Sequence, residues 1–168
     1  DAEGSFENIR AVEGLRVAQT IVRVVEIFRS QCVAEVFSEP SKITADHAAQ
    51  LEKCLLAAFP PDGENYRTHR HLQLTGEFAA RIAEKMQLNP HEFRALGMMH
   101  DVGRLITHQD GVNPHRYFRN DLLGETLMKR AGFSSQFLHH LQPRRSYLEP
   151  NMFASKDVFT LPQKIIML

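Results

Sequence analysis

Hydrophobic and polar residues recur along this chain with the period of an α-helix, most extensively from Phe6 to Phe37. That segment has one broad apolar stripe, and its charged residues lie largely off the stripe. The stripe comprises Ala18, Ile21, Val22, Val25, Phe28, Cys32, Val33 and Val36. A helix of this extent would be roughly 40 Å long at 1.5 Å per residue, which exceeds the needs of a small globule. We expect the stripe to pack against later helices. The alternative is that part of it forms a homodimer seam or a connector to an upstream domain, although it lacks a strict heptad.

A second segment with the helical period runs from Thr44 to Phe59, and Pro60 and Pro61 end it. Its inward face is predicted to comprise Ala48, Leu51, Leu55 and Ala58. Neither of these first two helices contains a residue pattern that carries chemistry, so we expect both to support the rest of the chain.

Two further helical runs are joined by Asn89 and Pro90, which suit the cap and the first position of a helix. One face is formed in the first run by Phe78, Ile82, Ala83 and Met86, and in the second by Phe93, Leu96, Gly97 and His100. A short connection makes the two helices antiparallel, so that their far ends meet. This arrangement would bring His71 beside the neighbours His100 and Asp101.

His71, His100 and Asp101 form a set that suits a divalent metal ion. Neutral imidazole nitrogen and carboxylate oxygen bind several such ions, so the identity stays open among Mn, Fe, Mg, Ni, Co and Zn. The carboxylate can also orient a water or bridge two ions, as hydrolytic sites require. From the residues alone, the alternative is that His71 is a surface residue and that His100 and Asp101 merely end a helix. With nine histidines in the chain, a chance His-Asp neighbour pair is not unusual.

The residues around this set resemble a known family. His71, the run LQLTGEFAARIA and the run MMHDVGRL are similar to the HD superfamily of metal-dependent phosphohydrolases, in which a His opens one helix, a His-Asp dyad closes another and a lone Asp follows later. The resemblance covers about Tyr66 to Leu168. It implies an all-α fold with a compact multi-helix HD-type domain over residues 63–168. Residues 1–62, with their long N-terminal helix, would be an extension packed on that core.

Cationic residues after the dyad are candidates for contacting a phosphate. Arg104 stands where the family often has a Lys, and a guanidinium can bind two phosphoryl oxygens at once. Its alternative role is that of a solvated residue near a helix C-terminus. The turn-rich loop from Thr107 to Arg119 contributes Arg116 and Arg119, which could form a cationic lid over an anionic substrate. Loop residues are also often charged simply because loops are solvated.

A histidine pair, His139 and His140, lies on the helix predicted from Ser134 to Leu141. The resemblance implies that one of the two contacts the site or its phosphate, whereas the other is an ordinary helix-end residue. In the branch of the family that cleaves cyclic dinucleotides, an acidic residue and Gly-Tyr-Pro follow such a pair. Here Gln142 and Pro143 come soon after it, which disfavours that branch.

Two departures from the family pattern affect the expected site. Asn120 begins a helix predicted from Leu122 to Ala131, at a place where branches with additional metals have a His, and this favours one ion over two or three. The sequence also ends at Leu168, before the family's final Asp, and Asp157 precedes the last predicted helix. The domain would therefore be truncated before that helix is complete. Because the chain opens at Asp1 rather than Met and ends in the uncapped apolar run from Lys164 to Leu168, we interpret it as a piece of a longer protein, with proteolytic trimming as the alternative.

Composition narrows the possible partners. The 168 residues include 20 Lys and Arg against 20 Asp and Glu, and the basic residues are scattered in sequence, which disfavours binding to duplex nucleic acid. Cys32 and Cys54 lie in apolar runs without metal-type spacing, which favours buried thiols in a reducing compartment. There is neither a leader pattern nor an apolar stretch of membrane-spanning length. We therefore predict a cytoplasmic protein without a membrane partner.

The resemblance and the residues together predict a metal-dependent phosphohydrolase acting on a small nucleotide or a related phosphate ester. His71, His100 and Asp101 would hold the ion, Asp101 would orient the attacking water, and Arg104 would stabilise charge on the phosphoryl oxygens. The alternative is a catalytically inactive sensor or dimerisation module with the same fold.

Overall fold

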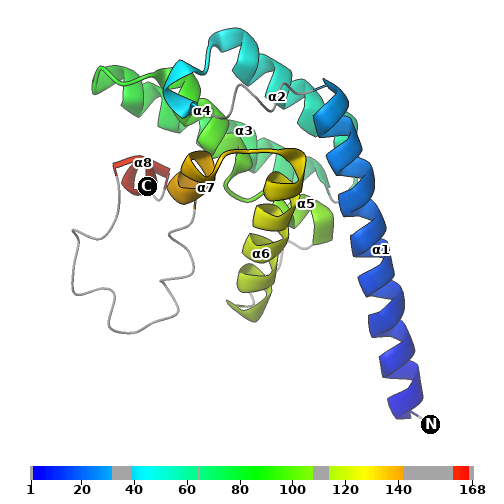
Figure 1. The fold of residues 1–168 in the computed structure, drawn as a ribbon. Coiled ribbons are helices and arrows are strands. Elements are labelled where there is room, and N and C mark those ends of the chain that lie inside the picture. Colours follow the sequence, from blue (N-terminus) through cyan, green and yellow to red (C-terminus); the bar gives the residue numbers. More distant parts are fainter. Residues whose placement is uncertain (1, 32–38, 64, 108–113, 142–160, 167–168) are drawn as a thin grey trace.

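The computed structural model is all-helical, which confirms the predicted fold class. It describes residues 2–31, 39–63, 65–107, 114–141 and 161–166, and no strand occurs among them. The elements are α1 (Ala2–Gln31), the short 3₁₀ helix η2 (Pro40–Lys42), α2 (Ala45–Ala58), α3 (Asn65–Lys85), α4 (Pro90–Met99), α5 (Gly103–Thr107), α6 (Pro114–Ala131), α7 (Ser135–Leu141) and α8 (Leu161–Ile166) (Figure 1). That the helices form an HD-type domain stays a prediction.

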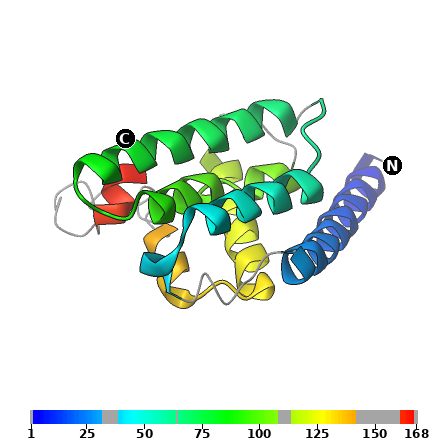
Figure 2. The same cartoon turned by 90° about the horizontal axis from the view of Figure 1, so that it is seen from above.

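The predicted antiparallel pair is present as α3 and α4, and local hydrogen bonds explain where α4 begins. Asn89 caps this helix by accepting a hydrogen bond from the backbone N–H of His91, and Pro90 takes its first position, as predicted. The Asn89 side chain also donates to the carbonyls of Ser41 and Ile43, which fixes the turn against the segment before α2. Seen from above, α3 runs along the outer edge of the molecule, with α4 and α2 on its inner side (Figure 2).

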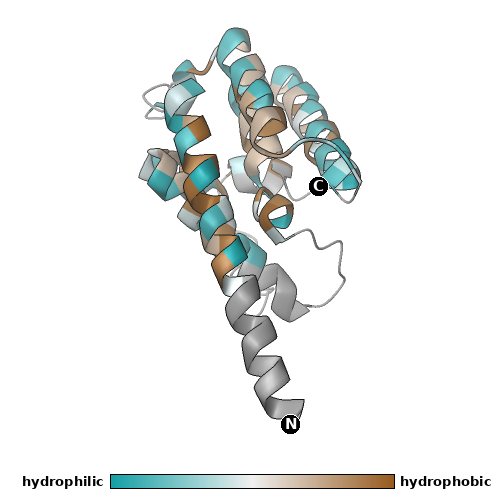
Figure 3. Ribbon diagram, turned by 90° about the vertical axis from the view of Figure 1, so that its right-hand side faces the viewer, coloured by the Kyte–Doolittle hydropathy of each residue, from teal (hydrophilic) through white to brown (hydrophobic). Residues whose placement is uncertain are grey.

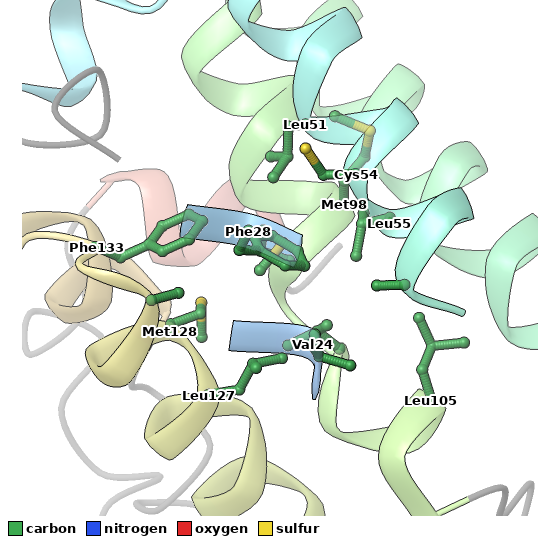
Figure 4. Packing of buried hydrophobic residues seen from close by; sticks show 14 of the residues in the cluster. Val24, Phe28, Leu51, Cys54, Leu55, Met98, Leu105, Leu127, Met128 and Phe133 are labelled. Carbon is green, nitrogen blue, oxygen red and sulfur yellow. The ribbon is translucent and has the colours of Figure 1, made fainter. Parts of the chain in front are cut away.

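One hydrophobic core joins the N-terminal helices to the rest. Its buried side chains come from the helices α1 to α7 and from the short segments between them. They include Val24, Phe28, Leu51, Leu55, Met98, Leu105, Leu127 and Phe133, which converge in Figure 4. Residues on both sides of position 62 thus share this core, and the division there into an extension and a domain stays a prediction.

The apolar stripe predicted on α1 is only partly correct. Ile21, Val25 and Phe28 are buried as expected, but Val22 is 52% exposed and Ala18 is also exposed. Val17 and Val24 take the inward positions instead, because α1 turns a narrower face to α2 and α6 than the stripe implied. In the part of this helix that Figure 3 colours by hydropathy, hydrophobic residues alternate with hydrophilic ones. Cys32, Val33 and Val36 lie outside the described residues, and the homodimer seam stays a prediction.

The face predicted for α3 also needs correction. Phe78 and Met86 are 53% and 46% exposed, whereas the small residues Gly76, Ala79 and Ala83 are buried. The side of α3 that contacts α4 around Gly76 consists of small residues because the two helices approach very closely there, and Phe78 and Met86 lie outside this contact.

The segment predicted as a loop up to Arg119 is helical in its second half. α6 begins at Pro114, so Asn120 lies inside this helix instead of before it. Pro114 suits the first turn of a helix, so the helix begins there and not at the cap predicted at Asn120. Side chains of α6 are described from Asn120 onward. Among the described helices, none combines the length and apolar character that crossing a bilayer requires.

Candidate metal centre

Three chain segments meet at the candidate site. His71 lies in the first half of α3, His100 caps the C-terminal end of α4, and Asp101 lies in the tight turn between α4 and α5. Two backbone hydrogen bonds hold this turn, one from Val102 to the carbonyl of Met99 and one from Arg104 to the carbonyl of Asp101. The sequence prediction that an early histidine meets a distant His-Asp pair is therefore confirmed.

Close approach of α3 and α4 is what brings the histidines together. A Cβ atom added to Gly97 would lie 2.6 Å from the Cα and 2.7 Å from the nitrogen of Gly76. A Cβ on Gly76 would in turn lie 2.9 Å from the carbonyl oxygen of Arg94. Both are backbone contacts that a side chain could relieve only by separating the helices. The two glycines thus set the distance between the helices one turn away from His71 and His100.

The ligand atoms of the three residues form a small triangle. His71 Nε2 and His100 Nε2 are 3.2 Å apart, and each lies 3.3 Å from the same oxygen of Asp101, Oδ2. Two donors that each lie about 2.1 Å from one ion at an angle of about 100° are about 3.2 Å from each other. The three distances therefore fit ligation of a single ion by two imidazoles and one carboxylate. This is the one such group of three potential ligands among the described residues.

A hydrogen bond orients the His100 imidazole for this purpose. Its Nδ1 lies 2.6 Å from the carbonyl oxygen of Gly97, and only the protonated nitrogen can donate to a carbonyl. Nε2 is then the nitrogen with the lone pair, and it is the one that faces His71 and Asp101. A backbone carbonyl on the outer ring nitrogen is the usual way in which proteins fix the tautomer and direction of a metal-binding histidine.

Asp101 is the buried centre of the site. Its side chain is 1% exposed, against 44% for the His71 side chain and 4% for that of His100. The guanidinium of Arg104 lies 3.0 Å from the same carboxylate oxygen that faces the two histidines. Solvent therefore reaches the group from the side of His71, and the Arg104 side chain beside Asp101 is 22% exposed.

Other predicted site residues are not brought to this group. His140 lies on α7, and its Nδ1 is 3.6 Å from Glu92 in the first turn of α4, eight positions and about 12 Å along that helix from His100. His139 is exposed on the same short helix. The side chains of Arg116 and Arg119 lie outside the described part of the structure, so their proposed contact with phosphate stays a prediction.

Asn120 stands where branches of the family with additional metals have a His, and in this structure it has a structural role. It is buried, and its Oδ1 accepts a hydrogen bond of 2.9 Å from the Thr107 hydroxyl, which links α5 to α6. A Cβ on Gly103 would lie only 1.8 Å from the carbonyl oxygen of Asn120. The glycine that follows the dyad thus allows α6 to pack directly on α5.

Two features near the site were missed in the sequence. His69, two residues before His71, is buried and bonds through Nε2 to the carbonyl of Phe59, and burial lowers its pKa. Glu52 of α2 accepts hydrogen bonds from Gln73 of α3 and Arg94 of α4, at 2.8 and 3.1 Å. These contacts brace the helices that carry the site. The helical period places His69 on the buried side of α3 and so could have separated it from His71.

Comparisons of the chain with models of protein families, with curated proteins and with solved structures found no match.

Proposed function

We propose that this protein is a metal-dependent phosphohydrolase with an HD-type site, acting on a small nucleotide or a related phosphate ester. The single observation that supports it best is the triangle of His71 Nε2, His100 Nε2 and Asp101 Oδ2, with mutual distances of 3.2 to 3.3 Å. These three side chains would hold the ion, and the substrate would approach from the exposed side of His71.

Each residue has a chemical task in this proposal. A bound divalent ion would supply Lewis acidity, lowering the pKa of water and neutralising phosphate charge. The His100 imidazole, fixed by the carbonyl of Gly97, keeps its lone pair directed at the site. Asp101 would accept a hydrogen bond from the attacking water and so orient it. Arg104, whose side chain is 22% exposed and whose guanidinium lies 3.0 Å from Asp101 Oδ2, would bind a phosphate held by the ion and stabilise its developing charge.

Metal content and turnover test the proposal together. Protein purified without chelator is analysed for bound metals, and phosphate release from a panel of nucleotides is measured with Mn, Mg, Co or Ni. We expect about one divalent ion per chain and turnover that stops on chelation. A His100→Ala variant that still binds the ion and turns over substrate at the wild-type rate would refute the assignment. So would a folded wild-type protein that binds none of these ions.

A second candidate is a non-catalytic sensor or assembly module. It is favoured by the N-terminal part of α1, which extends away from the other helices in Figure 1, and by two side chains on this helix, Leu15 and Val22, which are 61% and 52% exposed. Light scattering on the purified protein separates the two candidates when combined with the activity panel. A dimer that binds metal without turnover supports the module, and metal-dependent turnover excludes it.

A further inference from the structure

The outward side of α3 gathers cations that are separated in sequence. Two lie before His71 and two lie near the end of the helix, with two large apolar residues between them. All are spaced three or four positions from a neighbour, so they form one continuous strip on the helix surface. This outer α3 strip comprises Arg67, Arg70, His71, Leu74, Phe78, Arg81 and Lys85, and every member is exposed.

The four cations of the strip have no acidic partner among the described residues, since neither an ion pair nor another charged contact involves them. Between the two pairs of cations, the large apolar residues Leu74 and Phe78 are 54% and 53% exposed. The strip therefore offers positive charge at both ends and apolar area in the middle. Because His71 belongs to it, the strip is continuous with the candidate metal centre.

Spacing along α3 indicates the length of the ligand. From His71, Phe78 is about 10 Å along the helix axis, Arg81 about 15 Å and Lys85 about 21 Å. A nucleoside monophosphate with its phosphate at His71 has no second phosphate to place at Arg81 or Lys85. A strand of several nucleotides would place later phosphates there and a base over Phe78. Alternating cations and aromatic or apolar surface is how proteins bind single strands without sequence preference.

We propose that the outer α3 strip binds single-stranded nucleic acid and leads it to the metal centre, so that the phosphate esters cleaved there are phosphodiesters of an oligonucleotide. The catalytic part of this inference rests on the proposed function, whereas the binding part does not. A flat anionic membrane fits the strip less well, because Glu77 and Glu84 are exposed along one edge of it and would face the same surface. A narrow strand can follow the cations and avoid both carboxylates.

Binding of a fluorescent single-stranded oligonucleotide of about twelve nucleotides tests the proposal, measured by anisotropy at several salt concentrations and in the presence of EDTA. We expect the double variant Arg81→Ala/Lys85→Ala to weaken binding about 5- to 10-fold. It should also reduce the slope of log K against log salt by about 1.4, or about 0.7 for each lost phosphate contact. Phe78→Ala should weaken binding about 5-fold, as loss of a stacking surface does.

The matched control is Arg16→Ala/Arg23→Ala, which removes the same charge from exposed positions of α1. We expect this control to bind as the wild type does. Equal losses in the two double variants would overturn the proposal, as would wild-type affinity in the α3 variant. Strip-dependent binding to vesicles containing phosphatidylserine, without binding to the oligonucleotide, would overturn it in favour of a membrane.

The design separates this inference from the proposed function. Because EDTA is present, His100→Ala should leave oligonucleotide binding unchanged even where it abolishes metal binding. If the metal centre is inert but the α3 variants lose affinity, the strip stands and the hydrolase proposal fails. If the oligonucleotide does not bind but nucleotides are hydrolysed, the reverse holds.

Discussion

An imidazole lies beside a carboxylate at both ends of α4, but in the described part of the chain only the C-terminal end has three potential metal ligands close together. At the C-terminal end, Asp101 Oδ2 lies 3.3 Å from each of two imidazole nitrogens. At the N-terminal end, Glu92 lies 3.6 Å from His140, and no third ligand joins this pair among the described residues. The difference is in the number of ligands, because at the C-terminal end α3 adds His71 to the neighbours His100 and Asp101, and the backbone carbonyl of Gly97 orients His100.

The glycine contact of α3 and α4 explains that difference physically. His71 reaches His100 because Gly76 and Gly97 let the two backbones touch one turn away. Neither α7 nor the first turn of α4 contains a glycine, so no contact of this kind joins them, and His140 lies on the short helix α7. A His-acid pair is thus easily formed between any two neighbouring helices, whereas three convergent ligands require a specified distance between them.

The largest effect is expected from breaking that contact. Gly97→Val places side-chain carbons where the backbone of Gly76 lies, so the helices must separate. We expect a loss of at least about 3 kcal/mol in the free energy of unfolding, at the upper end of overpacking effects, measured by urea denaturation. Gly14→Ala is the matched control, since a Cβ there meets nothing within 4 Å, and it should be neutral or slightly stabilising. Equal stability of the two variants would mean that the close contact is not required.

The next effect concerns the ligands themselves. His100→Ala removes one corner of the triangle. Metal affinity is measured by calorimetric titration with Mn or Zn. Loss of a residue that only hydrogen-bonds to a metal ligand typically lowers affinity about 10- to 100-fold, and loss of the ligand itself should lower it further. Asp101→Asn should reduce it similarly, because the neutral amide is a poorer ligand. Retention of wild-type affinity in either variant would show that the ion is held elsewhere.

Features of the fold and site that depend on local sequence signals could be predicted, whereas those that depend on how the helices pack could not. The antiparallel pair and its cap at Asn89 followed from local signals, and the meeting of His71 with His100 followed from them. The buried face of α3 did not, because hydrophobicity alone favours Phe78 over Gly76, and only the helix separation decides which fits. The placement of His140 depends on how α7 packs on α4, which no local pattern specifies.

A third histidine, His69, should make the stability of the protein depend on pH. His69 is buried two residues from His71, and burial lowers its pKa below the unfolded value of about 6.5. The unfolded state therefore binds the proton more readily, so its contribution to stability is complete above about pH 6.5 and is lost as pH falls toward the folded pKa. With EDTA present, the free energy of unfolding should fall between pH 7.5 and 5.5 by up to about 1.4 kcal/mol per pH unit from this residue.

His69→Gln isolates that contribution, because an amide N–H can still donate to the carbonyl of Phe59 but does not titrate in this range. We expect a shallower pH dependence than in the wild type. His139→Gln, at an exposed position, should leave the wild-type dependence in place. If the two variants show the same dependence, the acid sensitivity arises from other groups.

The smallest effect is expected at the other end of α4, and it completes the comparison. His140→Ala removes the imidazole that faces Glu92, but their separation of 3.6 Å is longer than a good hydrogen bond, so the pair contributes little. We expect the free energy of unfolding to fall by no more than about 1 kcal/mol and the metal affinity to stay within about twofold of the wild type. If His140→Ala instead lowered metal affinity as strongly as His100→Ala, the predicted phosphate-side role of this histidine would have to include the ion. The two ends of α4 would then act as one site. The meeting of three ligands at Asp101 would in that case not explain why one end of the helix binds metal and the other does not.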